Sequence, residues 1–414
     1  MAFEGDYLGF FRESLEKLRE EGNYRVFANL ERRSDSFPHA KRHTENGEED
    51  VLVWCSNDYL GIGQDSRVRE AMIETIKAQG AGAGGTRNIS GTNRLHGELE
   101  RQLASLHGKE AALLFTSGYV ANLTALSTLA SRLPGCIVYS DSENHNSMIE
   151  GIRQGRSDKR VFRHNDPAHL DELMAADDPS RPKIVAFESV YSMDGDISPI
   201  SEILDVAEKY NAISFLDEVH AVGMYGEHGA GVAERDGVMD RVDILQGTLG
   251  KAFGVIGGYI AAKAELIDFV RSFGNPFIFT TALPPAIAAG ALKAIEILRD
   301  AKDIRAKHQE RAATVKARLR QAGIPILPSV THIVPVLIGD AEKCKKASDM
   351  LLNDFNIYVQ PINYPTVAKG TERLRVTPTP HHDDDAVDRL INALDKVWTA
   401  LDLPRTSSAQ AAAE

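Results

Sequence analysis

The stretch from residue 243 to residue 254 places one lysine, Lys251, in a run of small residues. A short apolar run precedes it, and glycines surround it at Gly247, Gly250, Gly254, Gly257 and Gly258. This setting suits a lysine that forms a Schiff base, because its amine must lose a proton before it attacks a carbonyl. The same residues also fit a surface lysine in a tight turn. A P-loop is excluded, because Leu245 stands where that motif needs glycine and Ala252 where it needs serine or threonine.

A second polar group, Phe215-Leu-Asp-Glu-Val-His220, ends an apolar run upstream of Lys251. Pyridoxal phosphate needs a lysine for its aldehyde and a carboxylate that keeps its ring nitrogen protonated. Asp217 supplies such a carboxylate, and His220 is placed to reach the phenolic oxygen of the ring. The alternative is that Asp217 and Glu218 are a turn acid and a surface acid, and that His220 is a structural histidine.

A phosphate group needs backbone N–H groups, and the beginning of a helix offers them. The turn Thr116-Ser-Gly-Tyr119 precedes a helix predicted over residues 121–133, so Gly118 and Tyr119 are candidate phosphate contacts. Thr248, three residues before Lys251, adds a hydroxyl. Gly118 also fits a plain turn with no ligand.

From residue 95 onward, apolar runs alternate with helical stretches. The predicted strands are residues 111–115, 136–139, 160–162, 183–187, 212–216, 243–245 and 258–262. This alternation predicts an α/β fold with a mostly parallel seven-stranded sheet covered on both faces. Ligands of such sheets bind beyond the carboxyl ends of the strands. The polar residues that follow the strands are therefore candidates for one site: Gly118, Tyr119, Ser140, His145, Glu188, Ser192, Asp217, His220, Thr248 and Lys251.

The organisation along the chain predicts four parts. These are an N-terminal helix and strand segment (1–50), a large domain (51–290), a small C-terminal α+β domain (291–402) and a disordered Ser/Ala-rich tail (403–414). Helices are expected at 9–22, 66–79, 96–106 and 383–401, with one long helical region over 284–323. Residues 42–50 indicate a hairpin tip or loop. The glycines from Gly80 to Gly85 have dinucleotide-motif spacing, but a helix precedes them where that motif needs a strand.

Composition restricts the classes of partner. The 414 residues are 43% hydrophobic and 26% charged, with a net charge of −12. That charge argues against nucleic acid and anionic membranes as partners, and no apolar run has membrane-spanning length. Three scattered cysteines and an acidic start without a leader pattern favour the cytoplasm. The pair His381-His382, which precedes three aspartates, is interpreted as a solvated helix start rather than a metal site.

With these residues identified, the chain resembles the α-oxoamine synthases, which are pyridoxal phosphate enzymes of aminotransferase fold type I. The resemblance extends from Tyr24 to Trp398, and it is strongest to the branch that joins glycine to succinyl-CoA. The motifs that carry it are Asn57-Asp-Tyr-Leu-Gly61, Gly84-Gly-Thr-Arg-Asn-Ile-Ser-Gly91, Phe187-Glu-Ser-Val-Tyr-Ser-Met-Asp-Gly195, Leu216-Asp-Glu-Val-His-Ala-Val-Gly223, Gly247-Thr-Leu-Gly-Lys-Ala252 and Pro361-Ile-Asn-Tyr-Pro-Thr366.

The resemblance implies a large domain with the seven-stranded sheet, a smaller C-terminal domain and a bacterial homodimer with sites at the subunit interface. It implies that Lys251 holds the cofactor and later acts as general base, while Asp217 pairs with the pyridinium. His145 would stack on the ring, and His220 and Ser192 would contact its phenolic oxygen side. The remaining cofactor contacts would be Glu188, Gly118, Tyr119 and Thr248, with Thr280 and Thr281 from the second subunit.

The resemblance also implies the substrate contacts. Arg375 would bind the glycine carboxylate and Asn57 would help to line that site. Arg25, Thr86 and Asn88 would hold the succinyl carboxylate. Ser140, Lys159 and Ile89 would lie along the CoA path, with Thr366 on a lid. From the residues alone, Arg25 and Arg375 suit bidentate binding of a carboxylate, but such cations are more often partners in surface ion pairs, and only the resemblance favours the substrate role.

Three alternatives stay open at this point. The first is another α-oxoamine synthase, such as 2-amino-3-ketobutyrate CoA ligase, which uses acetyl-CoA, or 8-amino-7-oxononanoate synthase. The second is an aminotransferase that needs no CoA, and the third is a non-catalytic protein that carries the cofactor. No cysteine precedes a proline, so haem feedback through a Cys-Pro motif is not expected.

Overall fold

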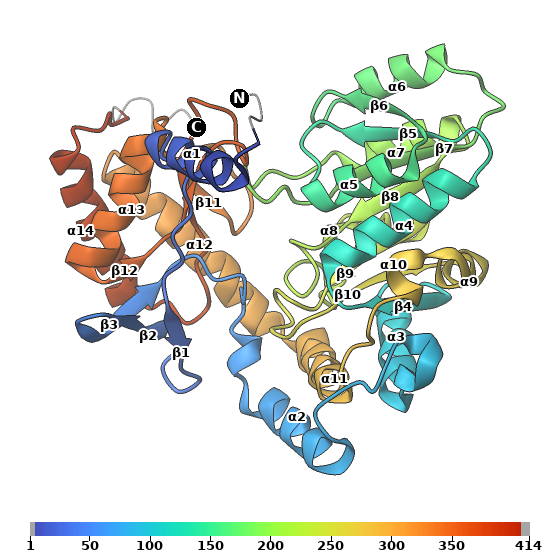
Figure 1. Cartoon of the computed structure of the whole chain (residues 1–414), viewed down its shortest axis with the longest axis horizontal. Helices are drawn as coiled ribbons and strands as arrows, with labels where there is room; N and C mark the ends of the chain where they lie inside the picture. The colour runs from blue at the N-terminus through green and yellow to red at the C-terminus, as the bar shows by residue number, and fades with distance from the viewer. Residues whose placement is uncertain (1–4, 407–414) are drawn as a thin grey trace. The chain divides into compact units, whose positions relative to one another are not determined.

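The computed structural model describes residues 5–406, and the chain forms two compact units (Figure 1). The first, here called the sheet unit, consists of Asn57–Ser192 and Asp196–Lys307. The second, here called the terminal unit, consists of the described parts of residues 1–56 and 308–414 together with Met193–Gly195. Of the tail predicted as disordered, residues 407–414 lie outside the described residues.

The sheet unit is built on a seven-stranded sheet in which only β10 runs antiparallel to its neighbours. The strand order is β4-β10-β9-β8-β7-β5-β6. The strands are β4 (Ala111–Phe115), β5 (Ile137–Asp141), β6 (Asp158–Phe162), β7 (Lys183–Glu188), β8 (Ile213–Asp217), β9 (Ile244–Thr248) and β10 (Gly258–Ala262). The predicted α/β class and the seven-stranded, mostly parallel sheet are confirmed.

Continuous apolar runs place these strands in the middle of the unit, where both faces are covered. All residues of β5, β7, β9 and β10 are buried. Four of the strands, β5, β7, β8 and β9, end in the polar residues Asp141, Glu188, Asp217 and Thr248. The register brings neighbouring ends together, because Glu188 pairs with Asp217, and Asp217 pairs with Gln246 near the end of β9. Several polar side chains are thereby gathered at one edge of the sheet.

Helices cover this sheet, and α4 packs across β4, β9 and β10 (Figure 1). The helices of the unit are α2 (Ser66–Gln79), α3 (Arg94–Leu106), α4 (Gly118–Arg132), α5 (Asn146–Gly155), α6 (Pro167–Ala176), α7 (Ile200–Lys209), α8 (Val232–Arg235), α9 (Ala264–Phe273), α10 (Asn275–Ile278) and α11 (Pro285–Asp300), with short turns η1 (Ile62–Gln64), η2 (Arg87–Gly91) and η3 (Met239–Arg241). The predicted bounds of α2 are confirmed, with Asp65 accepting from Arg67 N at the start and Gly80 at the end. The expected helical region over 284–323 is two helices, because the chain leaves helical geometry at Ala301 before α12 (Lys302–Gln321).

Two glycines allow close backbone approaches beside the lysine loop. Gly254 has a φ of 71°, and a Cβ there would lie 2.0 Å from Gly63 N. A Cβ on Gly258 would lie 2.4 Å from Gly118 N. Only glycine fits either contact, so both positions are fixed by the packing of the loop against η1 and the start of α4.

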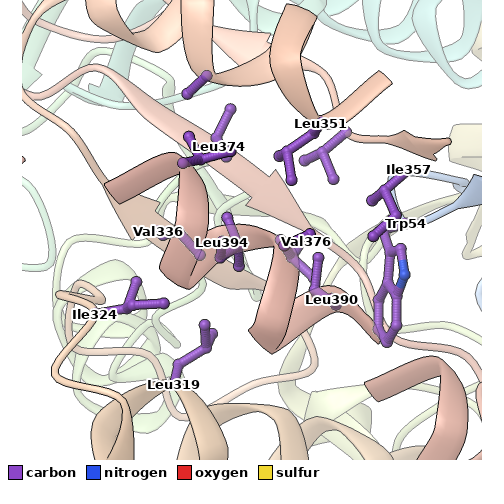
Figure 2. Packing of buried hydrophobic residues seen from close by; sticks show 14 of the residues in the cluster. Trp54, Leu319, Ile324, Val336, Leu351, Ile357, Leu374, Val376, Leu390 and Leu394 are labelled. Carbon is purple, nitrogen blue, oxygen red and sulfur yellow. The ribbon is translucent and has the colours of Figure 1, made fainter. Parts of the chain in front are cut away.

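The terminal unit contains two small sheets, of order β1-β2-β3-β12 and β11-β14-β13. The strands are β1 (Leu30–Arg32), β2 (His39–Thr44), β3 (Gly47–Val53), β11 (Val334–Leu337), β12 (Ile357–Tyr358), β13 (Pro361–Ile362) and β14 (Arg373–Val376); the helices are α1 (Tyr7–Glu20), most of α12, α13 (Ala341–Phe355) and α14 (Asp384–Ala400). The hairpin tip predicted within 42–50 joins β2 to β3. Figure 2 shows its core, in which Leu374 and Val376 pack with Leu390 and Leu394.

The expected helix start after His381-His382 is present, but only His381 of the pair is exposed to solvent. Asp383 caps α14 by accepting from Ala386 N, and Asp384 and Asp385 occupy its first turn. His382, however, is fully buried and stacks on Trp54 with ring centroids 3.8 Å apart. Its Nδ1 accepts from Thr379 N at 2.9 Å and its Nε2 lies 3.1 Å from Val53 O, so it is a structural core histidine.

No helix in the part of the chain that the structure describes is both long and apolar enough to cross a membrane. Among those same residues no cluster of three or more His, Cys, Asp or Glu side chains is arranged to hold a metal ion. The three cysteines are free thiols, and Cys136 and Cys344 are buried.

Candidate active site

Lys251 lies in the loop after β9 and contacts His220, which lies in the loop after β8. Its Nζ is 3.0 Å from His220 Nε2, and His220 Nδ1 is 2.8 Å from the hydroxyl of Tyr59. That hydroxyl donates to Asn57 Oδ1 at 3.2 Å. One proton arrangement satisfies all three contacts: Lys251 donates to Nε2, Nδ1–H donates to the Tyr59 oxygen, and Tyr59 donates to Asn57. The structure thus brings Lys251 and His220, two of the predicted site residues, into direct contact.

Asp217 ends β8 with only 3% of its surface exposed. Its Oδ2 accepts from Asn122 Nδ2 at 2.7 Å and its Oδ1 from Val219 N at 2.8 Å. Burial raises the pKa of Asp217, while the hydrogen bonds from Asn122 and Val219 and the charge of Lys251 oppose that rise. The alternative of a turn acid in solvent is excluded for Asp217.

Asn122 also connects Asp217 to His145. Its Nδ2 lies 3.0 Å from Ser147 Oγ, and Ser147 Oγ lies 2.7 Å from His145 Nδ1. Burial, and then the charge of Lys251, lower the pKa of His145 to about 4. His145 is therefore a neutral ring at physiological pH, held at the start of α5 with its backbone N–H donating to Glu188.

Two further carboxyl groups at this edge, those of Glu188 and Glu218, are buried as well. Burial and the neighbouring Asp217 raise the pKa of Glu188 well above its ordinary value. Glu218 turns away from Asp217 and accepts from Ser189 Oγ and from the backbone of Val232 and Ala233. Burial raises the pKa of Glu218 to about 7, so the alternative that it is a surface acid is wrong.

Helix α4 begins at Gly118, three residues earlier than predicted, after the N-cap Ser117. A Cβ on Gly118 would lie 3.2 Å from Gln246 Nε2 and 3.3 Å from Thr248 Oγ1, so the helix start faces the end of β9 closely. The Thr248 hydroxyl donates to Gly257 O at 2.9 Å. Tyr119 is partly exposed and donates to Asn146 Oδ1 at 3.1 Å, with its ring edge-on to His145.

The predicted contacts at residues 86–89 lie in an exposed turn tied to residues 280–282. Thr86 forms a bridge with Thr281, and Ala282 N donates to Gly85 O at 2.9 Å. Thr86 Oγ1 accepts from Ile89 N, and Asn88 and Ile89 point outward on the surface. Thr280 and Thr281 line a small pocket with Thr116 of the same chain.

Ser192 follows the end of β7 and is half-buried. Ser140 is buried near the end of β5, where its Oγ accepts from Asn144 Nδ2 at 2.9 Å. Lys159 is exposed on β6.

The terminal unit holds the other three predicted residues. Arg25 and Thr366 line one cavity of about 890 Å³, together with Arg42, Lys345 and Tyr358 among others. Arg375 lies on β14, buried, and is not among the residues that line this cavity. The structure thus brings Arg25 and Thr366 together within this unit, although they are far apart in sequence.

Sequence reasoning missed Asn122, Ser147 and Tyr59. Asn122 is polar on the buried face of α4, between Ala121 and Ala125, and that pattern is the signal that could have identified it. Ser147 follows His145 by two residues within the same loop-to-helix junction. Tyr59 lies inside the motif that begins at Asn57, where only Asn57 was assigned a role.

Comparison with known proteins agrees with this geometry. The family model "Aminotransferase class I and II" matches residues 49–394. A 5-aminolevulinate synthase of Bradyrhizobium diazoefficiens is 59% identical over 407 residues, covering 98% of this chain and 100% of that protein. The chain belongs to the 5-aminolevulinate synthase family.

Other members and neighbours support the same placement in the 5-aminolevulinate synthase family. The enzyme of Rhizobium meliloti is also 59% identical, over 97% of this chain and 99% of that protein. A solved serine palmitoyltransferase from S. paucimobilis with bound PLP has a TM-score of 0.88 at 29% identity, covering 96% of this chain and 99% of the other. The aminotransferase-type α/β fold expected from the sequence is thereby confirmed.

Proposed function

We propose that this chain condenses glycine with succinyl-CoA to give 5-aminolevulinate, CoA and carbon dioxide, with pyridoxal 5′-phosphate as its cofactor. The observation that carries the proposal is the contact between Lys251 and His220 at the edge where Asp217 is buried. It occurs in a chain that is 59% identical to a 5-aminolevulinate synthase along its whole length. Another α-oxoamine synthase is the less favoured alternative.

The residues present fit the cofactor. Asp217 is a buried carboxyl group whose charged form is disfavoured by burial, so a cationic ring nitrogen beside it compensates that cost. The start of α4 at Gly118 offers backbone N–H groups of the kind that bind phosphate, and a side chain at Gly118 would crowd Gln246 and Thr248. The chain therefore has both a partner for the ring and a cradle for the phosphate.

When bound, the cofactor supplies an aldehyde for an amine and a cationic ring that withdraws charge from the glycine α-carbon. Lys251 provides the amine, and His220 Nε2 accepts a hydrogen bond from its Nζ and keeps it oriented. The Lys251 Nζ would also accept the proton of the glycine α-carbon as general base. The carboxylate of Asp217 would pair with the ring nitrogen of the cofactor, and the neutral ring of His145 would offer a stacking face.

The residues assigned to the two substrates are also part of this proposal. Arg25 is assigned to the succinyl carboxylate with Thr86 and Asn88, since a guanidinium binds a carboxylate through two parallel hydrogen bonds. Arg375 and Asn57 are assigned to the glycine carboxylate. The CoA path is assigned to Ser140, Lys159 and Ile89, with Thr366 on a closing loop.

The proposal also includes that the chain forms a homodimer and that it works in the cytoplasm. Ile89 and Phe279 are 69% and 78% exposed, which is unusual for large apolar side chains and favours cover by a second subunit. Thr280 and Thr281 would then contribute to the phosphate site of the partner. Free rather than paired cysteines agree with a reducing compartment.

The test is an assay of free thiol with purified protein. Thiol release is expected only when both glycine and succinyl-CoA are present, and the protein is expected to absorb visible light when loaded with the cofactor. Equal efficiency with acetyl-CoA would assign the chain to a different α-oxoamine synthase. Turnover of glycine with a keto acid and no CoA would indicate an aminotransferase.

A further inference from the structure

His164 lies between two loops that carry candidate cofactor contacts. One loop follows β5 and leads from Asp141 to His145. The other is a hairpin after β7, closed by the bridge between Val190 and Ile197, and it carries Ser192. His164 itself follows β6 and belongs to neither loop.

Both ring nitrogens of His164 contact a carboxylate. Its Nδ1 is 2.9 Å from Asp141 Oδ1 and its Nε2 is 2.7 Å from Asp196 Oδ2. Ionised carboxylates only accept hydrogen bonds, so both ring nitrogens must carry a proton for both contacts to form. The ring also meets Tyr191 edge-on, with centroids 4.4 Å apart and planes at 90°.

The next residue, Asn165, makes parallel contacts. Its backbone N–H donates to Asp141 Oδ2 at 2.9 Å, and its Nδ2 donates to Asp196 Oδ2 at 2.7 Å. Its Oδ1 accepts from Ser198 Oγ at 2.8 Å. Asp141 is 2% exposed and accepts from Glu143 N as well, so the start of the His145 loop is fixed at several points.

We propose that His164 is a positioning residue that stays positively charged and clamps the His145 loop to the Ser192 hairpin. The link runs from Asp141 through the imidazolium to Asp196, whose backbone carbonyl accepts from Tyr191 N at 3.3 Å, one residue before Ser192. The effect of this clamp on cofactor binding rests on the proposed function, whereas the clamp itself does not. Without the cation, two carboxylates face each other across the gap between the loops.

The charges around His164 favour this state at working pH. Partial burial opposes the charged ring, but hydrogen bonds to Asp141 and Asp196 and the nearby Glu143 outweigh burial and raise the pKa of His164 to about 10. Tyr191, the other titratable group against the ring, has a pKa raised well above its ordinary value by burial and stays neutral. The contribution of His164 to the free energy of unfolding is therefore complete below pH 6.5. It declines above that pH and is lost as the pH passes about 10.

The first experiment measures cofactor binding by fluorescence quenching in three variants. His164→Gln removes the cation and is expected to weaken pyridoxal phosphate binding by about tenfold, since charge-assisted hydrogen bonds are lost on both sides. His228→Gln is the matched control, because His228 also contacts a carboxylate, Glu234, at 2.7 Å but lies on the surface. The double variant His164→Gln with Asp196→Asn removes the facing charge and is expected to recover part of the affinity.

Recovery of affinity in the double variant would show that His164 acts through its charge. If His164 had a purely steric role, replacing Asp196 would not restore the affinity. No loss of affinity in His164→Gln, or further weakening in the double variant, would overturn the proposal.

The second experiment needs neither cofactor nor activity. The ring nitrogens of His164 are followed by ¹⁵N NMR of the wild-type protein without cofactor, with His228 as internal reference. A doubly protonated ring that persists from pH 6 to pH 9 is expected, and a ring that becomes neutral near pH 6.5 would refute the clamp even if His164→Gln fails to fold. Hydrogen exchange of residues 142–146 and 190–197 in His164→Gln is expected to be faster than in the wild type. If wild-type protein bound no cofactor, the proposed function would fail while the NMR result on the clamp would stand.

Discussion

Asn122 and Asp217 are joined by a hydrogen bond of 2.7 Å from the amide nitrogen to Oδ2, across two elements that lie far apart in the sequence. Asp217 is buried, and this bond is one of two that stabilise its charged form. The same amide nitrogen reaches Ser147, which contacts His145. Asn122 therefore positions both the acid and the ring proposed to contact the cofactor.

Replacing Asn122 is expected to weaken cofactor binding. Asn122→Ala removes a hydrogen bond to a buried carboxylate, an interaction worth about 1.5–3 kcal/mol, so the dissociation constant should rise by about tenfold or more. The pKa of Asp217 should also rise, and binding should be lost at a higher pH on acidification than in the wild type. Equilibrium titration with pyridoxal phosphate at several pH values checks both effects. Asn392→Ala, on the exposed face of α14, is the control, and equal affinity in the two variants would contradict the assigned role.

Replacing Lys251 is expected to abolish turnover. Lys251→Ala removes both the amine that holds the cofactor and the general base, so kcat should fall by at least about a thousandfold. Cofactor should still bind, loosely, through the phosphate and ring contacts, and dialysis should remove it. Lys263→Ala is the control, because Lys263 is an exposed lysine on the next loop of the same sheet. An active Lys251→Ala protein would refute the mechanism.

Removing the Tyr59 hydroxyl is expected to lower kcat severalfold with little effect on folding. In Tyr59→Phe the Nδ1–H of His220 loses its acceptor, which costs about 1 kcal/mol and releases the orientation of the ring against Lys251. Steady-state kinetics with both substrates measure the effect. Tyr139→Phe is the matched control, since its hydroxyl donates to Asp177 at 2.8 Å, outside this network. A similar loss in both variants would mean that the effect is structural.

The sheet of this fold could be predicted closely, because its strands are short apolar runs bounded by polar residues. The predicted strands over 111–115 and 258–262 coincide with β4 and β10, and the other five differ only at their ends. The structure accordingly places Asp141, Glu188, Asp217 and Thr248 at the ends of β5, β7, β8 and β9. The break at Ala301 could not be predicted, because neither glycine nor proline marks it and the residues on both sides favour a helix.

Residues that act through long-range contacts were harder to predict. Asn122 lies inside a helix and contacts Asp217 from there, whereas the strand pattern predicts only residues that follow strands. The three aspartates that follow His382 predict a solvated position, yet its ring packs on Trp54, which lies near the opposite end of the sequence. Local composition predicts neither contact, since each depends on how distant segments pack.

The burial of His382 predicts a pH dependence of stability. Burial lowers the pKa of His382 to about 3, so acidification protonates the unfolded chain first, and the free energy of unfolding falls as pH drops from 6.5 toward 3. The titration of this one group should make the free energy of unfolding about 2 kcal/mol lower at pH 5 than at pH 7.5. His382→Gln should be less stable at pH 7.5 but show a flatter decline to pH 5 in denaturant titrations. The neighbouring and exposed His381→Gln should keep the wild-type slope, and an unchanged slope in His382→Gln would contradict the assignment.

Acyl-CoA selectivity is expected to depend on Arg25. Arg25→Lys keeps the charge but loses the two parallel hydrogen bonds that a guanidinium makes to a carboxylate, so KM for succinyl-CoA should rise by about tenfold while KM for glycine stays unchanged. Efficiency with acetyl-CoA, which has no carboxylate, should be unaffected, so discrimination between the two acyl-CoA substrates should narrow. Arg42→Lys is the matched control, because Arg42 lines the same cavity but is held by Glu49 at 3.3 Å and Asn353 at 2.9 Å. If Arg25→Lys raised KM for both acyl-CoA substrates equally, Arg25 would act on the shared CoA portion and not on the succinyl carboxylate.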